Sequence, residues 1–254
     1  MRFKKAILKT PSKAMINGLT SQNFGTPDYN LACKQHNLYK RALEKAGVKT
    51  IVLNPDENYP DSCFVEDTAI LTEEFAIITN PGADSRKGEI FDIKSKLSEF
   101  YKTIYSITPP GTLDGGDVLR VENGFFIGIS ARTNIEGGEQ LKAILEKNGY
   151  KAFFVKLDKY LHLKTGVAYL GNNTLVLAGE LKNNQAFKDF NKIIVDDKEE
   201  YAANCIKVND FVLLAKGFPK IKQDINNLGH IILELDMSEF RKIDGGLSCL
   251  SLRF

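Results

Sequence analysis

Four short hairpin patterns at regular spacing constrain the fold more than any other feature of this sequence. Residues 68–82, 117–130, 167–180 and 205–217 each contain an apolar run, a short polar turn and a second apolar run. The turn centres fall near 73, 123, 172 and 209, so the spacing is about 50, 49 and 37 residues. Periods of this size are typical of supersecondary units repeated around an axis.

A helical pattern and then another strand follow each hairpin. In the second repeat, Thr133 and Glu136 predict a capping box, and Asn148-Gly149 ends the helix before a strand at 151–157. The ranges 91–107, 185–197 and 221–235 have the same place in the other repeats. The sequence therefore predicts an α/β protein of ββαβ units.

A fifth repeat is split between the two ends of the chain. Residues 246–254 supply one strand and residues 2–10 another, followed by a helix over 26–47 and a strand at 50–54. Thr26 is the expected N-cap, Pro27 the first helical residue and Gly47 the stop. Pairing of the terminal strands would close a ring. Since no Pro/Gly/Ser-rich linker interrupts the chain, we expect a single domain over 1–254.

Composition excludes several classes of function. The 34 basic and 32 acidic residues are interspersed and give a net charge of +2, so a nucleic-acid partner is not expected. No apolar run approaches the roughly 20 residues that span a bilayer, so no membrane association is expected. The four cysteines lie far apart without a C-x-x-C pair, which predicts free thiols in a cytoplasmic protein.

One cysteine and one histidine are candidates for nucleophilic catalysis. Cys249 follows a Gly-Gly pair in an apolar stretch, and His162 lies between leucines just before a core hairpin. Taken singly, Cys249 has the alternative of a buried structural thiol, and His162 that of a core histidine whose hydrogen bonds are satisfied. Together they fit a thiol with its base. His36, on an amphipathic helix, is expected at the surface, and His230 near a strand start.

Acidic residues gather where two core strands begin. Asp61, Glu66 and Asp67 precede one of these strands, and Asp114 and Asp117 flank two glycines before the other. Buried carboxylates are costly unless paired or facing a ligand. Turn capping is the accepted interpretation for Asp117, whereas Asp67 and Asp114 together predict a pocket for a compact cation. Phe64 could add a cation–π wall.

Arg86 and Arg132 each follow a hairpin, so they are expected at the same end of the ring. Arginine binds carboxylates through two parallel bonds, although a solvated surface charge is the alternative for each. Carboxylates at one end of the pocket and arginines at the other would fit a ligand that is cationic at one end and anionic at the other.

Long motifs then resemble a known family. "PDSCFVEDTAIL", "PGADSRKGE", "LDGGDVL", "SARTNIEG", "HLKTGVAYL" and "KIDGGLSCLSLRF" are similar, in this order and essentially end to end, to dimethylarginine dimethylaminohydrolases. The resemblance implies a five-bladed pseudosymmetric α/β propeller (pentein) whose last blade is closed by the N- and C-terminal strands. It also implies hydrolysis of N-omega-methylated arginines to citrulline plus dimethylamine or methylamine, as part of arginine metabolism.

The resemblance also implies roles for single residues. Cys249 would attack the guanidinium carbon to give a thiouronium intermediate, and His162 would protonate the departing amine and then activate water. Asp114, where some relatives carry Glu, would support His162. The implied substrate contacts are Glu66 and Asp67 at the guanidinium, Arg86 and Arg132 at the α-carboxylate, Leu19 in a lid, Phe64 beside the cation, and Asp61 and Ile243 at the amino-acid end.

No metal or cofactor is implied, although zinc could bind Cys249 and inhibit. The expected partner is the small-molecule substrate, with the protein acting as a monomer or homodimer. Two alternatives remain: an arginine deiminase or other amidino hydrolase, and a non-catalytic propeller that binds other molecules.

Overall fold

The computed structural model describes residues 2–254 and divides the chain into two compact bodies. The central body, Asp67–Asn204, is continuous in sequence, whereas the flanking body combines the residues up to Glu66 with Cys205–Phe254. The single domain expected over 1–254 depends on how these bodies join, so it stays a prediction. No helix within residues 2–254 is both long and apolar enough to cross a membrane.

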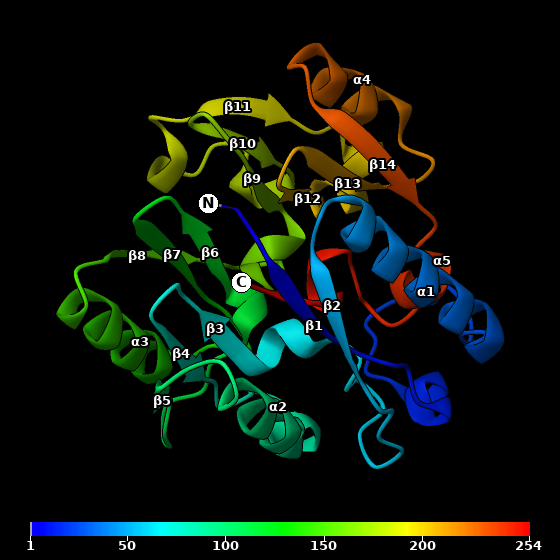
Figure 1. Cartoon of the computed structure of the whole chain (residues 1–254). Coiled ribbons are helices and arrows are strands. Elements are labelled where there is room, and N and C mark those ends of the chain that lie inside the picture. Colours follow the sequence, from blue (N-terminus) through cyan, green and yellow to red (C-terminus); the bar gives the residue numbers. More distant parts are fainter. Residues whose placement is uncertain (1) are drawn as a thin grey trace. The chain divides into compact units, whose positions relative to one another are not determined.

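Residues 2–254 form five three-stranded sheets, and each has a central strand paired antiparallel on one side and parallel on the other (Figure 1). The predicted count of five repeats is therefore confirmed. The central body holds β3 (Ala69–Leu71), β4 (Phe75–Ile78) and β5 (Thr103–Ser106); β6 (Val118–Val121), β7 (Gly124–Ile129) and β8 (Lys151–Lys156); and β9 (Val167–Gly171), β10 (Thr174–Leu177) and β11 (Asn191–Ile194). The flanking body holds β12 (Ile206–Val208), β13 (Phe211–Ala215) and β14 (Ile231–Leu235); and β15 (Leu252–Arg253), β1 (Lys5–Lys9) and β2 (Lys49–Leu53).

The hairpin turns lie where the sequence predicts them, with one shift. Asn172 and Asn173 have φ values of 50° and 56°, the left-handed pair that a type I′ turn requires. In the preceding hairpin Val121 pairs with Gly124. The turn residues there are Glu122 and Asn123, one position earlier than expected, and Gly124 begins β7.

The two ends of the described chain meet in one sheet, as predicted. Strand β15 pairs antiparallel with β1, with Ile7 opposite Leu252, and β1 pairs parallel with β2. The carbonyl of Phe254 accepts from the backbone N–H groups of Lys4 and Lys5. This pairing gives the apolar tail its structural reason.

Four of the five repeats contain an α-helix between hairpin and parallel strand, and a short fifth helix precedes the tail. They are α1 (Tyr29–Lys45), α2 (Ile90–Leu97), α3 (Ile135–Lys147), α4 (Pro219–Asn227) and α5 (Ser238–Arg241). Gly47, Gly149 and Gly229 follow the ends of α1, α3 and α4 with positive φ, as C-terminal stops do. The helix stops predicted at Gly47 and Gly149 are confirmed.

Both predicted N-caps are wrong by one or two residues. Asp28, not Thr26, caps α1 and accepts from the N–H of Leu31. Asn134, not Thr133, caps α3 and accepts from Gly137. The Thr133 hydroxyl instead donates to a buried carboxylate elsewhere in the body, which the local sequence does not show.

The third repeat lacks the predicted α-helix. A 3-10 turn over Gln185–Phe187 takes its place, and the Asn184 side chain caps it by accepting from the N–H of Ala186. Asn184 favours turns over helix interiors because its side chain competes for backbone N–H groups.

His36 is buried on the inner face of α1 and not at the surface, so the prediction for this residue is wrong. Its side chain is 5% exposed, and within residues 2–254 no group hydrogen-bonds its Nε2. Burial lowers the pKa of His36 to about 4, so the imidazole is neutral.

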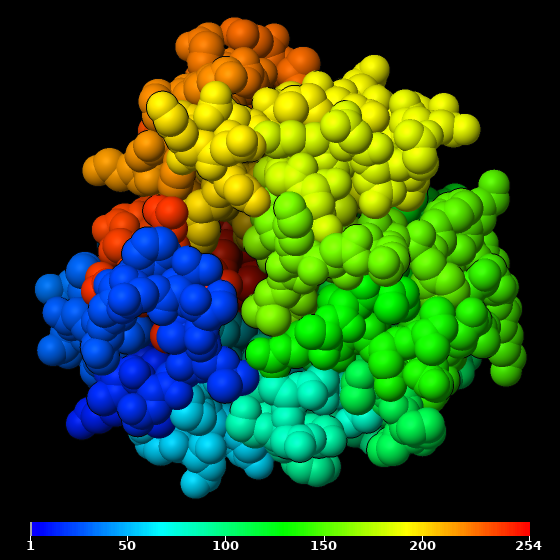
Figure 2. All heavy atoms as spheres, turned by 180° about the vertical axis from the view of Figure 1, so that it is seen from behind, coloured from blue at the N-terminus to red at the C-terminus, as the bar shows by residue number. Residues whose placement is uncertain are grey.

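Helix α3 shows how amphipathic spacing builds the core of the central body. Leu141 and Leu145 lie one turn apart and pack with Phe125 and Ile127 of β7. Burying side chains of this size contributes about 1.5–3 kcal/mol each. In the space-filling view, the side chains of this body form one continuous surface from the cyan through the green to the yellow residues (Figure 2).

Candidate active site

His162 lies in the central body, at the start of a 3-10 turn over Leu163–Thr165. The loop before it is fixed by one carboxylate, because Glu180 accepts from the backbone N–H groups of Asp158, Lys159 and Tyr160. The His162 side chain is only 12% exposed. The backbone before His162 is therefore fixed, and the side chain itself is largely buried.

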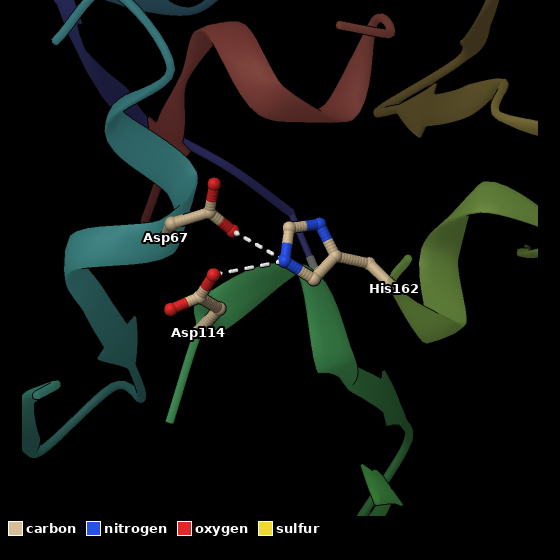
Figure 3. A group of neighbouring side chains, drawn as sticks. All are labelled: Asp67, Asp114 and His162. Atoms are coloured by element: carbon tan, nitrogen blue, oxygen red, sulfur yellow. Dashed lines mark hydrogen bonds and ion pairs between the residues drawn. The ribbon is translucent and has the colours of Figure 1, made fainter. Parts of the chain in front are cut away.

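Two carboxylates converge on one nitrogen of this ring (Figure 3). Nε2 of His162 lies 2.9 Å from Oδ2 of Asp114 and 4.0 Å from Oδ1 of Asp67. Burial alone would lower the pKa of His162, but the charge of Asp67 and the hydrogen bond to Asp114 raise it to about 9. At neutral pH the ring is an imidazolium, a proton donor in a nearly buried place.

The glycines after Asp114 permit this approach. A Cβ atom on Gly116 would lie 2.7 Å from Nδ1 of His162 and 2.9 Å from Oδ1 of Asp67, closer than real contacts allow. The N–H of Gly116 donates to that same oxygen of Asp67 at 2.8 Å. A side chain at position 116 would push the ring and the carboxylate apart.

Asp67 carries its charge although it is 3% exposed. Burial would raise its pKa, but the positive charges of His162 and Arg86 hold it at about 2. Nη1 of Arg86 donates to Oδ2 of Asp67 at 2.5 Å. Asp67 is therefore an anion at neutral pH.

Arg86 also binds Glu89, a residue that sequence reasoning missed. Its Nε donates to both oxygens of Glu89 at 3.1 Å, and Nη2 donates to Oε2 at 2.7 Å. Arg86 is 5% exposed and Glu89 4%. The prediction that Arg86 lies at the opposite end of the site from Asp67 is wrong, because two buried carboxylates need a shared cation. A role for Arg86 at the substrate α-carboxylate stays a prediction. The i,i+3 spacing of Arg86 and Glu89 is the signal that could have revealed the pair.

Asp114 is fully buried and anchored at both ends. The N–H of Gly82 donates to its Oδ1 at 2.8 Å, and its own N–H donates to the Thr133 hydroxyl at 3.1 Å. Arg132, the residue before Thr133, is half-buried, and its guanidinium makes no hydrogen bond or ion pair within residues 2–254. Arg132 is thus the predicted carboxylate ligand that is available to a substrate.

Spacing alone would let Asp67, Asp114 and His162 hold a metal ion, since one donor atom from each lies within 4.8 Å of the others. The two oxygens that face His162 are already bound: Oδ1 of Asp67 accepts from the N–H of Gly116, and Oδ2 of Asp114 pairs with Nε2 of His162. A dication bound by these atoms would have to displace the proton on Nε2 of His162, and it would lie beside the Arg86 cation that already pairs with Asp67. The cluster is therefore better suited to acid–base chemistry than to metal binding.

Cys249 lies in the flanking body, in a 3-10 turn over Ser248–Leu250, and the four cysteines of the chain are present as thiols. The N–H of Gly246 points at its Sγ across 3.4 Å. A backbone N–H aimed at sulfur favours the thiolate. Cys249 and His162 lie in different bodies, and their pairing stays a prediction.

Glu66 fixes the residue next to Cys249. Oε2 of Glu66 accepts from the Ser248 hydroxyl at 2.6 Å, and its Oε1 lies 3.4 Å from Nη2 of Arg253. The side chain is nearly buried, and Ser248 and Arg253 were not among the predicted residues. The contact of Glu66 with the substrate guanidinium stays a prediction.

Three predicted substrate contacts gather around Gly18 in the flanking body. The N–H of Leu19 donates to Oδ1 of Asp61 at 3.1 Å. A Cβ atom on Gly18 would lie 2.9 Å from that oxygen and 3.3 Å from Cδ1 of Ile243. Leu19 is 40% exposed and the other two are buried, and the roles of all three in substrate binding stay predictions. Phe64, also buried, packs edge-on against Phe240 with ring centroids 6.2 Å apart.

Comparison with known proteins gives the family. The family model of eukaryotic N,N-dimethylarginine dimethylhydrolase matches residues 19–212. The N(G),N(G)-dimethylarginine dimethylaminohydrolase of Pseudomonas aeruginosa is 49% identical over 99% of this chain and 100% of its own. The chain belongs to the dimethylarginine dimethylaminohydrolase family. The Streptomyces coelicolor family member is 33% identical over 100% of this chain and 98% of its own.

Solved structures of the dimethylarginine dimethylaminohydrolase family agree with this fold. A Cys249→Ser mutant of the Pseudomonas aeruginosa protein, complexed with citrulline, matches with a TM-score of 0.99 over 100% of both chains at 49% identity. The N-terminal domain of a cyanobacterial arginine dihydrolase matches with a TM-score of 0.89 over 100% of this chain and 97% of its own. At 17% identity, that match shows the fold alone. The predicted α/β fold class is confirmed, with five repeated three-stranded units, of which four have the full ββαβ order.

Proposed function

We propose that this chain hydrolyses N-omega-methylated arginines to L-citrulline plus dimethylamine or methylamine. The observation that carries the proposal is the imidazolium of His162, nearly buried between two carboxylates and held protonated at neutral pH. A dialkylamine leaves a tetrahedral carbon only when it is protonated, and His162 has that proton to give. Family membership supplies the substrate class.

The thiolate of Cys249 attacks the guanidinium carbon and forms a C–S bond, giving a tetrahedral adduct. His162 donates its proton to the methylated nitrogen, the C–N bond breaks, and the amine leaves a thiouronium on sulfur. Since Asp114 holds the Nε2–H, the transferred proton is the one on Nδ1.

In the second half, neutral His162 takes a proton from water, which attacks the same carbon. Collapse of the adduct breaks the C–S bond and releases citrulline, the proton of the added hydroxyl passes to solvent, and the thiolate and the imidazolium are regenerated. Asp67 and Asp114 stabilise the charged ring at both ends of this cycle, while Arg132 takes the substrate α-carboxylate. No step uses a metal, and zinc at Cys249 would block the nucleophile.

Two solved structures of relatives support this assignment by what has been bound in them. The Pseudomonas aeruginosa protein was solved with citrulline in its Cys249→Ser form, and a dimethylarginine dimethylaminohydrolase 49% identical to this chain was solved as an adduct of its His162→Gly form with S-methyl-L-thiocitrulline. Both replaced residues carry the numbers of the thiol and imidazole proposed here. We further propose a monomeric or homodimeric cytoplasmic enzyme of arginine metabolism.

The test is an amine-and-citrulline assay on purified protein kept with a chelator. Asymmetric dimethylarginine, monomethylarginine and arginine are offered in parallel. Citrulline with dimethylamine, and little ammonia from arginine, supports the proposal. Ammonia from arginine as the main product would move the protein to the deiminases, and no product from any of the three would leave a binding protein on this scaffold.

A further inference from the structure

Asp117 is a buried carboxylate that the reaction above does not use. It is 0% exposed, three residues after Asp114, and turn capping is the simplest expectation for it. Its Oδ1 accepts from the N–H of Leu163 at 2.9 Å, so it binds the backbone directly after His162. Its Oδ2 accepts from two hydroxyls, those of Ser130 and Thr133, each at 2.7 Å.

Both hydroxyls pass the contact on to the backbone of proposed site residues. Thr133 Oγ1 accepts from the N–H of Asp114 at 3.1 Å. Ser130 Oγ accepts from the N–H groups of Arg132 and Thr133 at 3.0 and 3.2 Å. The Asp117 carboxylate therefore bonds directly to the backbone next to His162. Through one hydroxyl each, it is linked to the backbone N–H groups of Asp114 and Arg132.

The missing side chain of Gly128 leaves room for the Asp117 carboxylate. A Cβ atom on Gly128 of β7 would lie 2.8 Å from Oδ1 of Asp117 and 2.9 Å from Cβ of Leu163. Turn capping requires only the local N–H groups, whereas these contacts join chain segments 13 to 46 residues apart. The geometry exceeds what a local cap needs.

We propose that Asp117 is a positioning residue for methylarginine hydrolysis, holding His162 and Asp114 in register through Leu163 and Thr133, and Arg132 through Ser130. This inference rests on the proposed function. The His162–Asp114 hydrogen bond of 2.9 Å joins two chain segments whose backbones meet at Asp117. Loss of the anchor would let that distance drift, and misplacement by about 1 Å costs on the order of 10²-fold in rate.

Replacing the Thr133 and Ser130 hydroxyls one at a time separates the positioning of Asp114 from the positioning of Arg132. Thr133→Val removes the link to Asp114 and should lower kcat about 10-fold with little change in KM. Ser130→Ala removes the link to Arg132 and should mainly raise KM. Thr133→Ser restores the hydroxyl and should recover most of the kcat lost in Thr133→Val. Thr72→Val is the matched control, since the buried Thr72 hydroxyl bonds Phe75, Glu74 and Tyr150 and, within residues 2–254, none of the proposed site residues.

Asp117→Asn tests the anchor directly. Its shape is unchanged, but an amide NH₂ then faces two hydroxyls whose oxygens already accept from N–H groups. We expect kcat to fall by about 10- to 100-fold. The pKa of His162 should also fall, because Asp67, Asp114 and Asp117 are the negative groups that raise it. The chain has three histidines, so NMR titration follows His162 without relying on turnover.

The outcomes are distinct. A kcat loss in Asp117→Asn with a lowered His162 pKa, and a kcat-against-KM split between Thr133→Val and Ser130→Ala, supports the proposal. Unchanged kinetics and an unchanged His162 pKa would overturn it, as would equal losses in Thr72→Val. If Asp117→Asn does not fold, the Thr133 pair decides: equal kcat for Val and Ser overturns the anchor. An inactive wild-type protein would refute the proposed function, while the His162 titration would still test the anchor.

Discussion

Raising the pH through about 9 should destabilise the folded protein by deprotonating one residue, His162. Its folded pKa lies above the ordinary value of 6.5, so the folded state binds the proton more tightly than the unfolded chain. By linkage, this stabilisation is fully present below pH 6.5 and is lost as the pH rises through about 9. The difference between the two pKa values corresponds to about 3 kcal/mol.

About 2 kcal/mol of this should be lost between about pH 7.5 and pH 10, a window above the titration of Asp117, whose pKa burial raises to about 6. Asp67 and its pKa of about 2 do not contribute there. The assay is urea unfolding of the wild type and of His162→Gln at both pH values. The wild type should lose about 2 kcal/mol more than the variant.

His230→Gln is the matched control, because His230 is less buried than His162 and its pKa is lowered. This variant should keep the pH dependence of the wild type. If the free energies of unfolding of the wild type and His162→Gln stay parallel between the two pH values, the charged-imidazole interpretation of the site is wrong.

Three further changes test other residues. Cys249→Ser should abolish turnover and leave the melting temperature near that of the wild type. Residual turnover in the amine assay would rule out Cys249 as the nucleophile. Arg132→Ala should raise KM for asymmetric dimethylarginine by at least about 10-fold, since the carboxylate loses a charged bidentate partner; an unchanged KM places that contact elsewhere. His36→Leu should stabilise the fold by about 1–3 kcal/mol, because it removes a buried nitrogen without a hydrogen-bond partner in the described chain. The gain should grow as pH falls from 6.5 towards 4, where the unfolded His36 binds a proton that the folded one excludes. An unchanged midpoint in urea at pH 5 would contradict this.

The repeat pattern was visible in the sequence because each hairpin depends on local chemistry. Alternating apolar runs and turn residues such as Asn172-Asn173 specify a two-residue connection wherever they occur. The terminal strand pairing followed from counting repeats. Asp67 and Asp114 were likewise predicted to lie together, because both stand where core strands begin, whereas the place of Asp114 beside His162 was implied by the family resemblance.

What sequence reasoning missed depends on partners far along the chain. Thr133 looks like a helix cap, but the carboxylate of Asp117, 16 residues away, takes its hydroxyl. Arg86 looks like a loop charge, yet Asp67 and Glu89 enclose it. His36 sits among polar neighbours in sequence, while the face of α1 that it occupies is buried. Such choices depend on which elements pack together, and a local pattern does not contain that information.

The split flanking body has a consequence for the order of folding. The internal contacts of Asp67–Asn204 lie within one continuous stretch, which can form them as soon as that stretch has left the ribosome. The sheet β15-β1-β2 must wait, since Ile7 meets Leu252 only after everything between them has been made. Closing a loop of that length carries an entropic penalty on the order of 5 kcal/mol. Until then β1 has an unpaired edge, which is a risk for aggregation during synthesis. Pulse-labelling hydrogen exchange during refolding should therefore show the amides of β7 protected before those of β1, and the reverse order would contradict this view.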